Sequence, residues 1–226
     1  MNVDGLMAFE DGNYSGVVVS KSSHVTLDHD NEQQNYTYST GAAVSISGAS
    51  SDVTVSRNWV TAYSSSGGVY VNGGSGDVIT TSILDNFDGP AAALVGAPSS
   101  DVTSNFISVP CKAGISLTSG SSSASVQNNV GVYAGFAGYP TSHGCPVTTA
   151  TQVDLLADSS STSGSTEGYN DLATNSTSIP AIYSWAGVGY ATPAAFTAAT
   201  GQGTQDVDST ASAYEIDSAN SAAPGE

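Results

Sequence analysis

Short runs of alternating apolar and hydroxyl-bearing residues fill most of the chain. Two kinds of run alternate along the chain. An example of the first is Ser-Asp-Val-Thr-Val-Ser at 51–56, and the second begins with a small residue, as in Gly-Val-Tyr-Val at 68–71. Alternation with a period of two predicts β-strands with one buried face. Apolar residues at the helical spacing i, i+3, i+4 and i+7 are absent from these runs, so we expect strands there.

The first kind of run recurs at spacings of 28, 25 and 24 residues, measured between Val25, Val53, Val78 and Val102. Self-similarity at such a period is typical of a solenoid, in which each repeat is one coil. The four valines are then expected to stack in one buried column, about 4.8 Å apart. An antiparallel sandwich with an Asn-Gly hairpin loop at 72–73 is the alternative, but a sandwich needs no recurrence in register. We therefore predict an all-β parallel β-helix.

The recurring Ser-Asp-Val-Thr-Val-Ser-x-Asn pattern is clearest over residues 12–133. It resembles the right-handed parallel β-helix repeats of secreted bacterial proteins, the pectate-lyase-like superfamily. Asn58, Asn105 and Asn129 are similar to the asparagine at a turn of that fold, but their spacing varies, so we expect no continuous asparagine ladder. The superfamily includes lyases, hydrolases, phage tailspikes and inert scaffolds, so the resemblance implies a fold more than an activity.

The repeat rhythm ends after Tyr133. We assign residues 1–158 to the coils, 159–205 to a C-terminal capping segment and 206–226 to an acidic, partly disordered tail. The capping segment resembles the closing segment of secreted β-helix proteins, which implies that it covers the open end of the coil.

A short helix is predicted inside the capping segment. Thr192 is suited to the N-cap, Pro193 to the first helical position and Gly201 to the position past the end. Trp185 and Phe196 are interpreted as apolar residues of the cap, with a sugar-stacking pair as the alternative.

Charge excludes several classes of function. The 226 residues include 3 Lys+Arg and 20 Asp+Glu, giving a formal net charge of −17. Three cations cannot form the basic surface that nucleic acids or anionic membranes require. No apolar stretch approaches the roughly 18 residues of a membrane-spanning helix. With 38 serines and 22 threonines, the surface is expected to carry mainly hydroxyl groups.

The two cysteines, Cys111 and Cys145, are interpreted as one disulfide in an oxidising compartment, with two unpaired buried thiols as the alternative. This favours an extracellular location. The residues after Met1 lack the basic and apolar regions of a signal peptide, so either a signal has been removed or the chain is a fragment. Repeat-like sequence already starts at Gly5, which favours a fragment of a larger secreted protein.

The densest group of functional side chains is Asp28, His29 and Asp30. On a strand, Asp28 and Asp30 would face the same side, as a calcium ion or a general acid–base pair requires. The repeat alignment places Arg57 one coil above His29 and Asn58 above Asp30. The alternative is a solvated charge cluster in which Arg57 is the counter-ion.

Polysaccharide lyases of the resembled superfamily use carboxylate-bound calcium beside a cationic base. This resemblance implies catalytic roles for Asp28, Asp30 and Arg57, with the two aspartates also as metal ligands. We add His29, Asn58 and Tyr70 as candidate substrate-binding residues. A second carboxylate pair, Asp85 and Asp88, could also take calcium, with ordinary turn chemistry as the alternative.

The expected function is binding or processing of a polysaccharide by an extracellular β-helix domain. Further domains of the same chain are expected as its partners. A non-catalytic structural or adhesive scaffold is the alternative. Whether the domain is an enzyme stays open, and an enzyme would be a polysaccharide lyase or a glycoside hydrolase. A net charge of −17 opposes acidic glycans as ligands.

Overall fold

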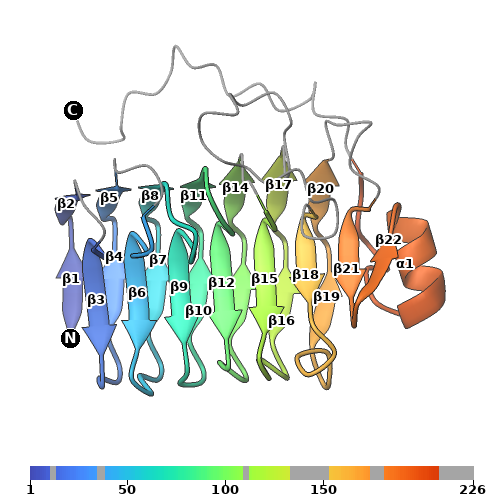
Figure 1. Ribbon diagram of the computed structural model, residues 1–226, viewed down its shortest axis with the longest axis horizontal. Helices are drawn as coiled ribbons and strands as arrows, with labels where there is room; N and C mark the ends of the chain where they lie inside the picture. Colours follow the sequence, from blue (N-terminus) through green and yellow to red (C-terminus); the bar gives the residue numbers. More distant parts are fainter. Residues whose placement is uncertain (11–13, 35–38, 109–111, 133–152, 174–180, 209–226) are drawn as a thin grey trace, which may run out of the picture.

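The chain forms a parallel β-solenoid with three sheets along its length (Figure 1). The computed structural model describes residues 1–10, 14–34, 39–108, 112–132, 153–173 and 181–208. Each coil contributes strands to the sheets in turn, and every described strand pair is parallel except the hairpin of β21 and β22. This confirms the predicted fold class.

The first sheet consists of β1 (Asn2–Asp4), β4 (Thr26–Asp28), β7 (Thr54–Ser56), β10 (Val78–Thr80), β13 (Asp101–Thr103), β16 (Ser125–Gln127) and β19 (Thr166–Gly168). The second sheet consists of β2 (Met7–Glu10), β5 (Asn31–Gln34), β8 (Trp59–Ala62), β11 (Ile83–Asn86), β14 (Phe106–Ser108), β17 (Val130–Val132) and β20 (Asp171–Ala173). The third sheet consists of β3 (Val17–Ser20), β6 (Val44–Ser47), β9 (Val69–Asn72), β12 (Ala92–Val95), β15 (Ile115–Thr118), β18 (Leu155–Ala157), β21 (Tyr183–Trp185) and β22 (Val188–Tyr190).

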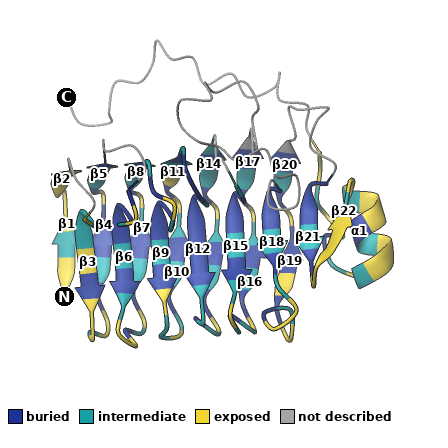
Figure 2. Cartoon of the chain, viewed as in Figure 1, coloured by how far each residue is buried: buried dark blue, intermediate teal, exposed yellow. Residues whose placement is uncertain are grey.

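Inward side chains of the three sheets form one continuous core, seen as the buried strand positions in Figure 2. In the first sheet, Leu27, Val55, Ile79, Val102 and Val126 stack in one column and are almost fully buried. Burying such a side chain contributes about 1.5–3 kcal/mol before entropy is counted.

The predicted valine column is wrong in its register. Val78 pairs with Thr54 and is only half-buried, while Ile79 pairs with Val55 and points inward. The predicted register is therefore one residue off at Val78, and it is two residues off at Val102, which pairs with Ile79. A one-residue shift exchanges the two faces of a strand, and the larger Ile79 side chain takes the core position.

A sharp corner joins the first sheet to the second in each coil. In the first coil this corner begins with Gly5, at a φ of 72°. In the later coils its first residue adopts a left-handed backbone with φ between 53° and 61°, and its side chain is exposed. These residues are His29, Arg57, Thr81, Ser104, Asn128 and Tyr169. The next residue of each corner points its side chain into the solenoid.

These inward corner side chains form a ladder of hydrogen bonds. Each side-chain oxygen accepts a hydrogen bond from the backbone N–H at the equivalent position of the preceding coil, at 2.7–3.1 Å. In chain order the acceptors are Asp30, Asn58, Ser82, Asn105, Asn129, Asn170 and Asp206. The asparagines are therefore not continuous, as expected, but the hydrogen-bond ladder is, because aspartate and serine supply the same acceptor where asparagine is missing.

The C-terminal end is closed by the β21–β22 hairpin and by α1 (Pro193–Thr200). The hydroxyl of Thr192 accepts a hydrogen bond from Ala195 N at 3.1 Å, and Gly201 ends the helix in a left-handed conformation. The predicted helix and its caps are confirmed.

The apolar side chains of this end pack on one another. Phe196 of α1 is fully buried and stacks on Tyr183, with ring centroids 4.2 Å apart. Trp185 is also buried and meets the edge of Phe196, which supports its interpretation as a cap residue and leaves no open face for a sugar. Within the described residues, no helix has the length and apolar character needed to cross a membrane.

The ladder makes a quantitative prediction at Asn105. Its Oδ1 accepts from Ser82 N at 3.1 Å and its Nδ2 donates to Ile79 O at 2.9 Å, both inside the solenoid. Asn105→Ala should lower the free energy of unfolding by about 1–3 kcal/mol, because buried backbone groups lose their partners. The exposed Asn72→Ala is the control, with a change within about 0.5 kcal/mol in urea denaturation. Equal losses in both variants would contradict the assigned role.

Candidate functional site

The candidate site lies on the outer side of the first sheet, where β4 ends. Asp28 is the last residue of this strand, and its side chain is only 11% exposed. Its Oδ1 accepts hydrogen bonds from Arg57 Nε at 2.8 Å and from Ser56 Oγ at 2.7 Å. A second guanidinium nitrogen of Arg57 contacts Oδ2, so both oxygens of Asp28 are engaged by the neighbouring coil.

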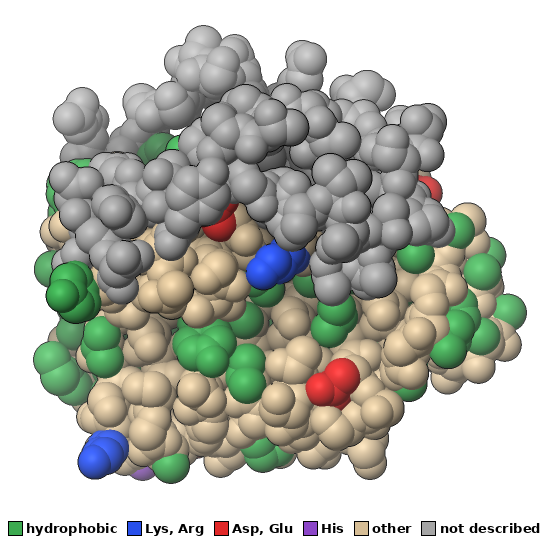
Figure 3. All heavy atoms as spheres, viewed as in Figure 1, with side chains coloured by type: hydrophobic (Ala, Val, Ile, Leu, Met, Phe, Trp, Pro, Cys, Tyr) green, Lys and Arg blue, Asp and Glu red, His purple; other side chains and the backbone are tan. Residues whose placement is uncertain are grey.

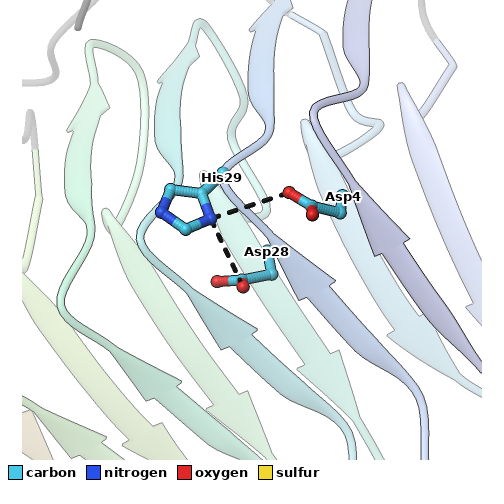
Figure 4. Close-up of side chains that lie close together, drawn as sticks. All are labelled: Asp4, Asp28 and His29. Atoms are coloured by element: carbon cyan, nitrogen blue, oxygen red, sulfur yellow. Dashed lines mark ion pairs between the residues drawn. The ribbon is translucent and has the colours of Figure 1, made fainter.

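His29 adds a third group to this cluster (Figure 4). Its Nδ1 lies 3.4 Å from Asp28 Oδ2 and 3.6 Å from Asp4 Oδ1. A typical metal site has at least three His, Cys, Asp or Glu side chains whose ligand atoms lie close together. In the described part of the chain, one group meets this condition with ligand atoms within 4.8 Å of one another: Asp4, Asp28 and His29.

The ion pair changes the acid–base properties of both partners. Hydrogen bonds from Arg57 and then from Ser56 hold the pKa of Asp28 well below its usual range. The hydrogen bond to Asp28 in turn raises the pKa of Arg57. Arg57 is therefore neutral even less often than a free arginine, and only the neutral form can accept a proton, which argues against its predicted role as a base. The interpretation of Arg57 as a counter-ion fits this geometry better.

Asp30 lies on the other side of the corner from Asp28. His29 has a φ of 55° and turns the chain between them, so the expectation that both carboxylates face one side of a strand is wrong. Asp30 is 2% exposed, and its Oδ1 accepts from Leu6 N at 2.7 Å. Desolvation raises its pKa. Asp30 therefore belongs to the ladder, and it cannot act with Asp28 on a ligand at the surface.

Asn58 is likewise part of the interior. It lies one coil above Asp30, as the repeat alignment predicted. Its Oδ1 accepts from Asp30 N at 2.7 Å and its Nδ2 donates to Leu27 O at 3.2 Å. Because both ends of the amide are engaged at 2% exposure, the side chain does not reach a substrate.

The donor set at Asp4, Asp28 and His29 does not fit calcium. Calcium takes six to eight oxygen ligands, whereas this cluster offers two carboxylates and an imidazole nitrogen. A metal ion would also have to displace Arg57 from Asp28. The side chains of this cluster therefore do not form a calcium site.

The other candidate residues lie on different sheets. Tyr70 points outward from β9 in the third sheet, and Asp85 lies on the outer side of β11 in the second. Asp85 accepts a hydrogen bond from Ser108, and burial raises its pKa. Asp88 is buried in the turn after β11. None of the three lies in the group around Asp28. Cys111 and Cys145 lie outside the described residues.

Sequence reasoning missed two kinds of residue. Asp4 pairs with Asp28 one coil earlier, and extending the repeat alignment toward the N-terminus could have found it. The second kind is the buried carboxyl group. The sequence pattern does not reveal it, because it occupies an inward position where an apolar side chain is expected. Glu32 is 1% exposed between Ala8 and Val60, and neither oxygen has a hydrogen-bond donor in the described residues.

Comparison with known families agrees with this architecture. A family model for the right handed beta helix region matches residues 7–154. The chain therefore belongs to the right-handed β-helix family. No curated protein and no solved structure matches the sequence.

Asp28 should stabilise the fold only while it is ionised. Its pKa is lowered on folding, so its contribution is present above the ordinary value of 3.8 and is lost as pH falls further. Asp28→Asn should therefore lower the melting temperature at pH 6, and this effect should shrink steadily as pH falls from 4 toward 2. Asp4→Asn is the control, because Asp4 is exposed and only approaches His29. Parallel pH curves for wild type and Asp28→Asn would contradict the role of the ion pair.

Glu32 should have the opposite dependence on pH. Burial raises its pKa from 4.5 to about 8, so the protonated form is favoured in the fold and stability falls as pH rises between these values. The loss is up to about 1.4 kcal/mol per pH unit. Glu32→Gln should therefore reduce the fall in stability between pH 5 and pH 7 in urea denaturation by this amount, leaving the contribution of Glu167. An unchanged slope would show that Glu32 ionises freely.

Proposed function

We propose that this β-helix is an extracellular, non-catalytic module that binds a neutral polysaccharide along the outer face of the first sheet. One observation carries the proposal: an outward row on this face is polar at every one of six consecutive coils. The row runs through Asp4, Asp28, Ser56, Thr80, Thr103 and Gln127, in register.

A row of this kind suits an extended glycan. Neighbouring coils place these side chains about 4.8 Å apart along the solenoid axis, so donors and acceptors repeat at a constant interval. Hydroxyl and amide groups both donate and accept hydrogen bonds, as sugar hydroxyls do. Ser56, Thr80, Thr103 and Gln127 are partly exposed, so a ligand could reach them.

The third sheet is a less regular surface. Figure 3 shows this side of the molecule, where uncharged polar side chains and backbone predominate and charged groups are few. However, both of its outward rows contain apolar side chains. One row is Val18, Ser45, Tyr70, Ala93 and Ser116, and the other is Ser20, Ser47, Asn72, Val95 and Thr118. Apolar side chains interrupt the hydroxyl groups, which favours the first sheet as the binding face.

Binding is favoured over processing because the predicted catalytic groups do not converge. Asp28 is engaged by Arg57 and Ser56, and Asp30 points into the core. The carboxylates required for general acid–base catalysis therefore do not face a common point at the surface. Since Arg57 is paired and the net charge is −17, neutral glycans are favoured over acidic ones.

The first test is a panel of neutral and acidic polysaccharides, each with and without calcium. Affinity electrophoresis of the full chain should show retardation by at least one neutral polysaccharide, independent of calcium. Assays for new reducing ends and for unsaturated products should stay at background. Turnover that Asp28→Asn abolishes would instead support an enzyme, and no binding across the panel would favour the scaffold alternative.

Variants then locate the binding face. Thr103→Glu places a carboxylate in the polar row and should weaken binding by about tenfold or more, equivalent to about 1.4 kcal/mol. Ser116→Glu makes a matched change on the third sheet, at a similarly half-buried outward position, and should leave affinity within about twofold. A larger loss for Ser116→Glu would move the binding face to the third sheet.

A further inference from the structure

Two carboxyl groups meet beneath the C-terminal cap. Glu167 lies in β19 at the inward position that Val126 occupies one coil earlier, and it is 5% exposed. Asp206 follows α1 and supplies the last acceptor of the ladder. A Cβ added at Gly203 would lie 2.8 Å from Asp206 Oδ2 and 3.0 Å from Glu167 Oε2. The two oxygens therefore face the same small space.

The hydrogen bonds around this pair indicate where a proton lies. Asp206 accepts from Asn170 N at 2.8 Å and from Tyr183 Oη at 2.9 Å. Glu167 Oε1 accepts from Asn170 Nδ2 at 2.7 Å, while Oε2 is buried without a donor in the described residues. Two carboxylate oxygens cannot bond to each other without a proton, so a protonated Glu167 donating to Asp206 satisfies both groups.

All other groups that face this pair are acidic or neutral. Tyr183 in β21 is neutral and donates its hydroxyl hydrogen bond to Asp206. Asp154, which precedes β18, is buried and interacts with Tyr183. Asp208 faces Asp154, and Asp171 in β20 faces Asp208. Burial, followed by the hydrogen bond and charge of Asp206, raises the pKa of Glu167 to about 9. Among the residues that the structure describes, no cation interacts with the pair to stabilise two ionised carboxylates.

The pair sits where the cap is attached to the last coil. Glu167 N donates to Gln202 Oε1 at 3.0 Å, and Gly203 N donates to Glu167 O at 3.0 Å. Val207 N donates to Asn170 O at 2.9 Å. The segment that follows α1 is therefore hydrogen-bonded on both sides of the Glu167–Asp206 contact, and α1 itself is held by Phe196 against Tyr183.

We propose that Glu167 and Asp206 share one proton and form a pH-sensitive latch, which holds the C-terminal cap closed in acidic and neutral solution and releases it in alkaline solution. Opening the cap exposes Glu167 to water, where it loses its proton. The opening equilibrium therefore rises with pH between the ordinary value of 4.5 and about 9, by up to about tenfold per pH unit.

Hydrogen exchange of the full chain tests the latch directly. Protection factors of the α1 amides, corrected for the intrinsic exchange rate at each pH, should fall by up to about 100-fold between pH 6 and pH 8. Glu167→Gln keeps a donor for Asp206 but has no proton to lose. Its α1 protection should change less than about threefold over the same range.

Glu32→Gln is the matched control. It removes an equally buried glutamate with a raised pKa from the opposite end of the solenoid, so the α1 amides should keep the wild-type dependence on pH. An equally steep fall of α1 protection in Glu167→Gln would overturn the proposal. So would loss of the dependence in Glu32→Gln, because the effect would then be global.

A second measurement needs no variant to fold. The ¹³C chemical shift of the Glu167 carboxyl group in the wild-type chain should titrate far above 4.5 and follow α1 opening. A midpoint near 4.5 with the cap closed would also overturn the latch.

Discussion

The solenoid depends on satisfying the backbone N–H groups that its corners bury. A corner residue with a left-handed backbone turns the chain sharply, which directs the next amide toward the interior, away from the sheets. Each such N–H is bonded by a side-chain oxygen of the following coil, from Leu6 to Asn170. Leaving one of these groups without a partner costs more than a typical hydrogen bond contributes, so the ladder limits which residues the corner accepts.

The sequence predicted the architecture well because each coil repeats the same alternation of buried and exposed positions. Register was harder, since Val78 and Ile79 are both apolar and only packing decides which of them points inward. The ladder was also missed, because Asp30, Ser82 and Asp206 serve as acceptors without resembling asparagine in the sequence.

The candidate site was predicted only in part. The alignment placed Arg57 next to Asp28 and His29, and the structure confirms that neighbourhood. The alignment could not place Asp30 correctly. The turn at His29 leaves Asp28 on the outer side of the sheet and points Asp30 into the core. Buried acids such as Glu32 and Glu167 were invisible for a related reason, since the alternating pattern assigns their positions to apolar residues.

The left-handed corner residues have a consequence of their own. His29, Arg57, Thr81, Ser104, Asn128 and Tyr169 form an exposed ridge in which each residue projects from an identical backbone. Their side chains differ in charge, size and polarity, yet each is followed by the same kind of ladder contact. Apart from Arg57, whose ion pair with Asp28 contributes to stability, side-chain identity on this ridge is therefore separated from the folding of the coil. The solenoid can exchange the other five side chains during evolution or design, presenting a new chemical pattern at fixed spacing on an unchanged frame.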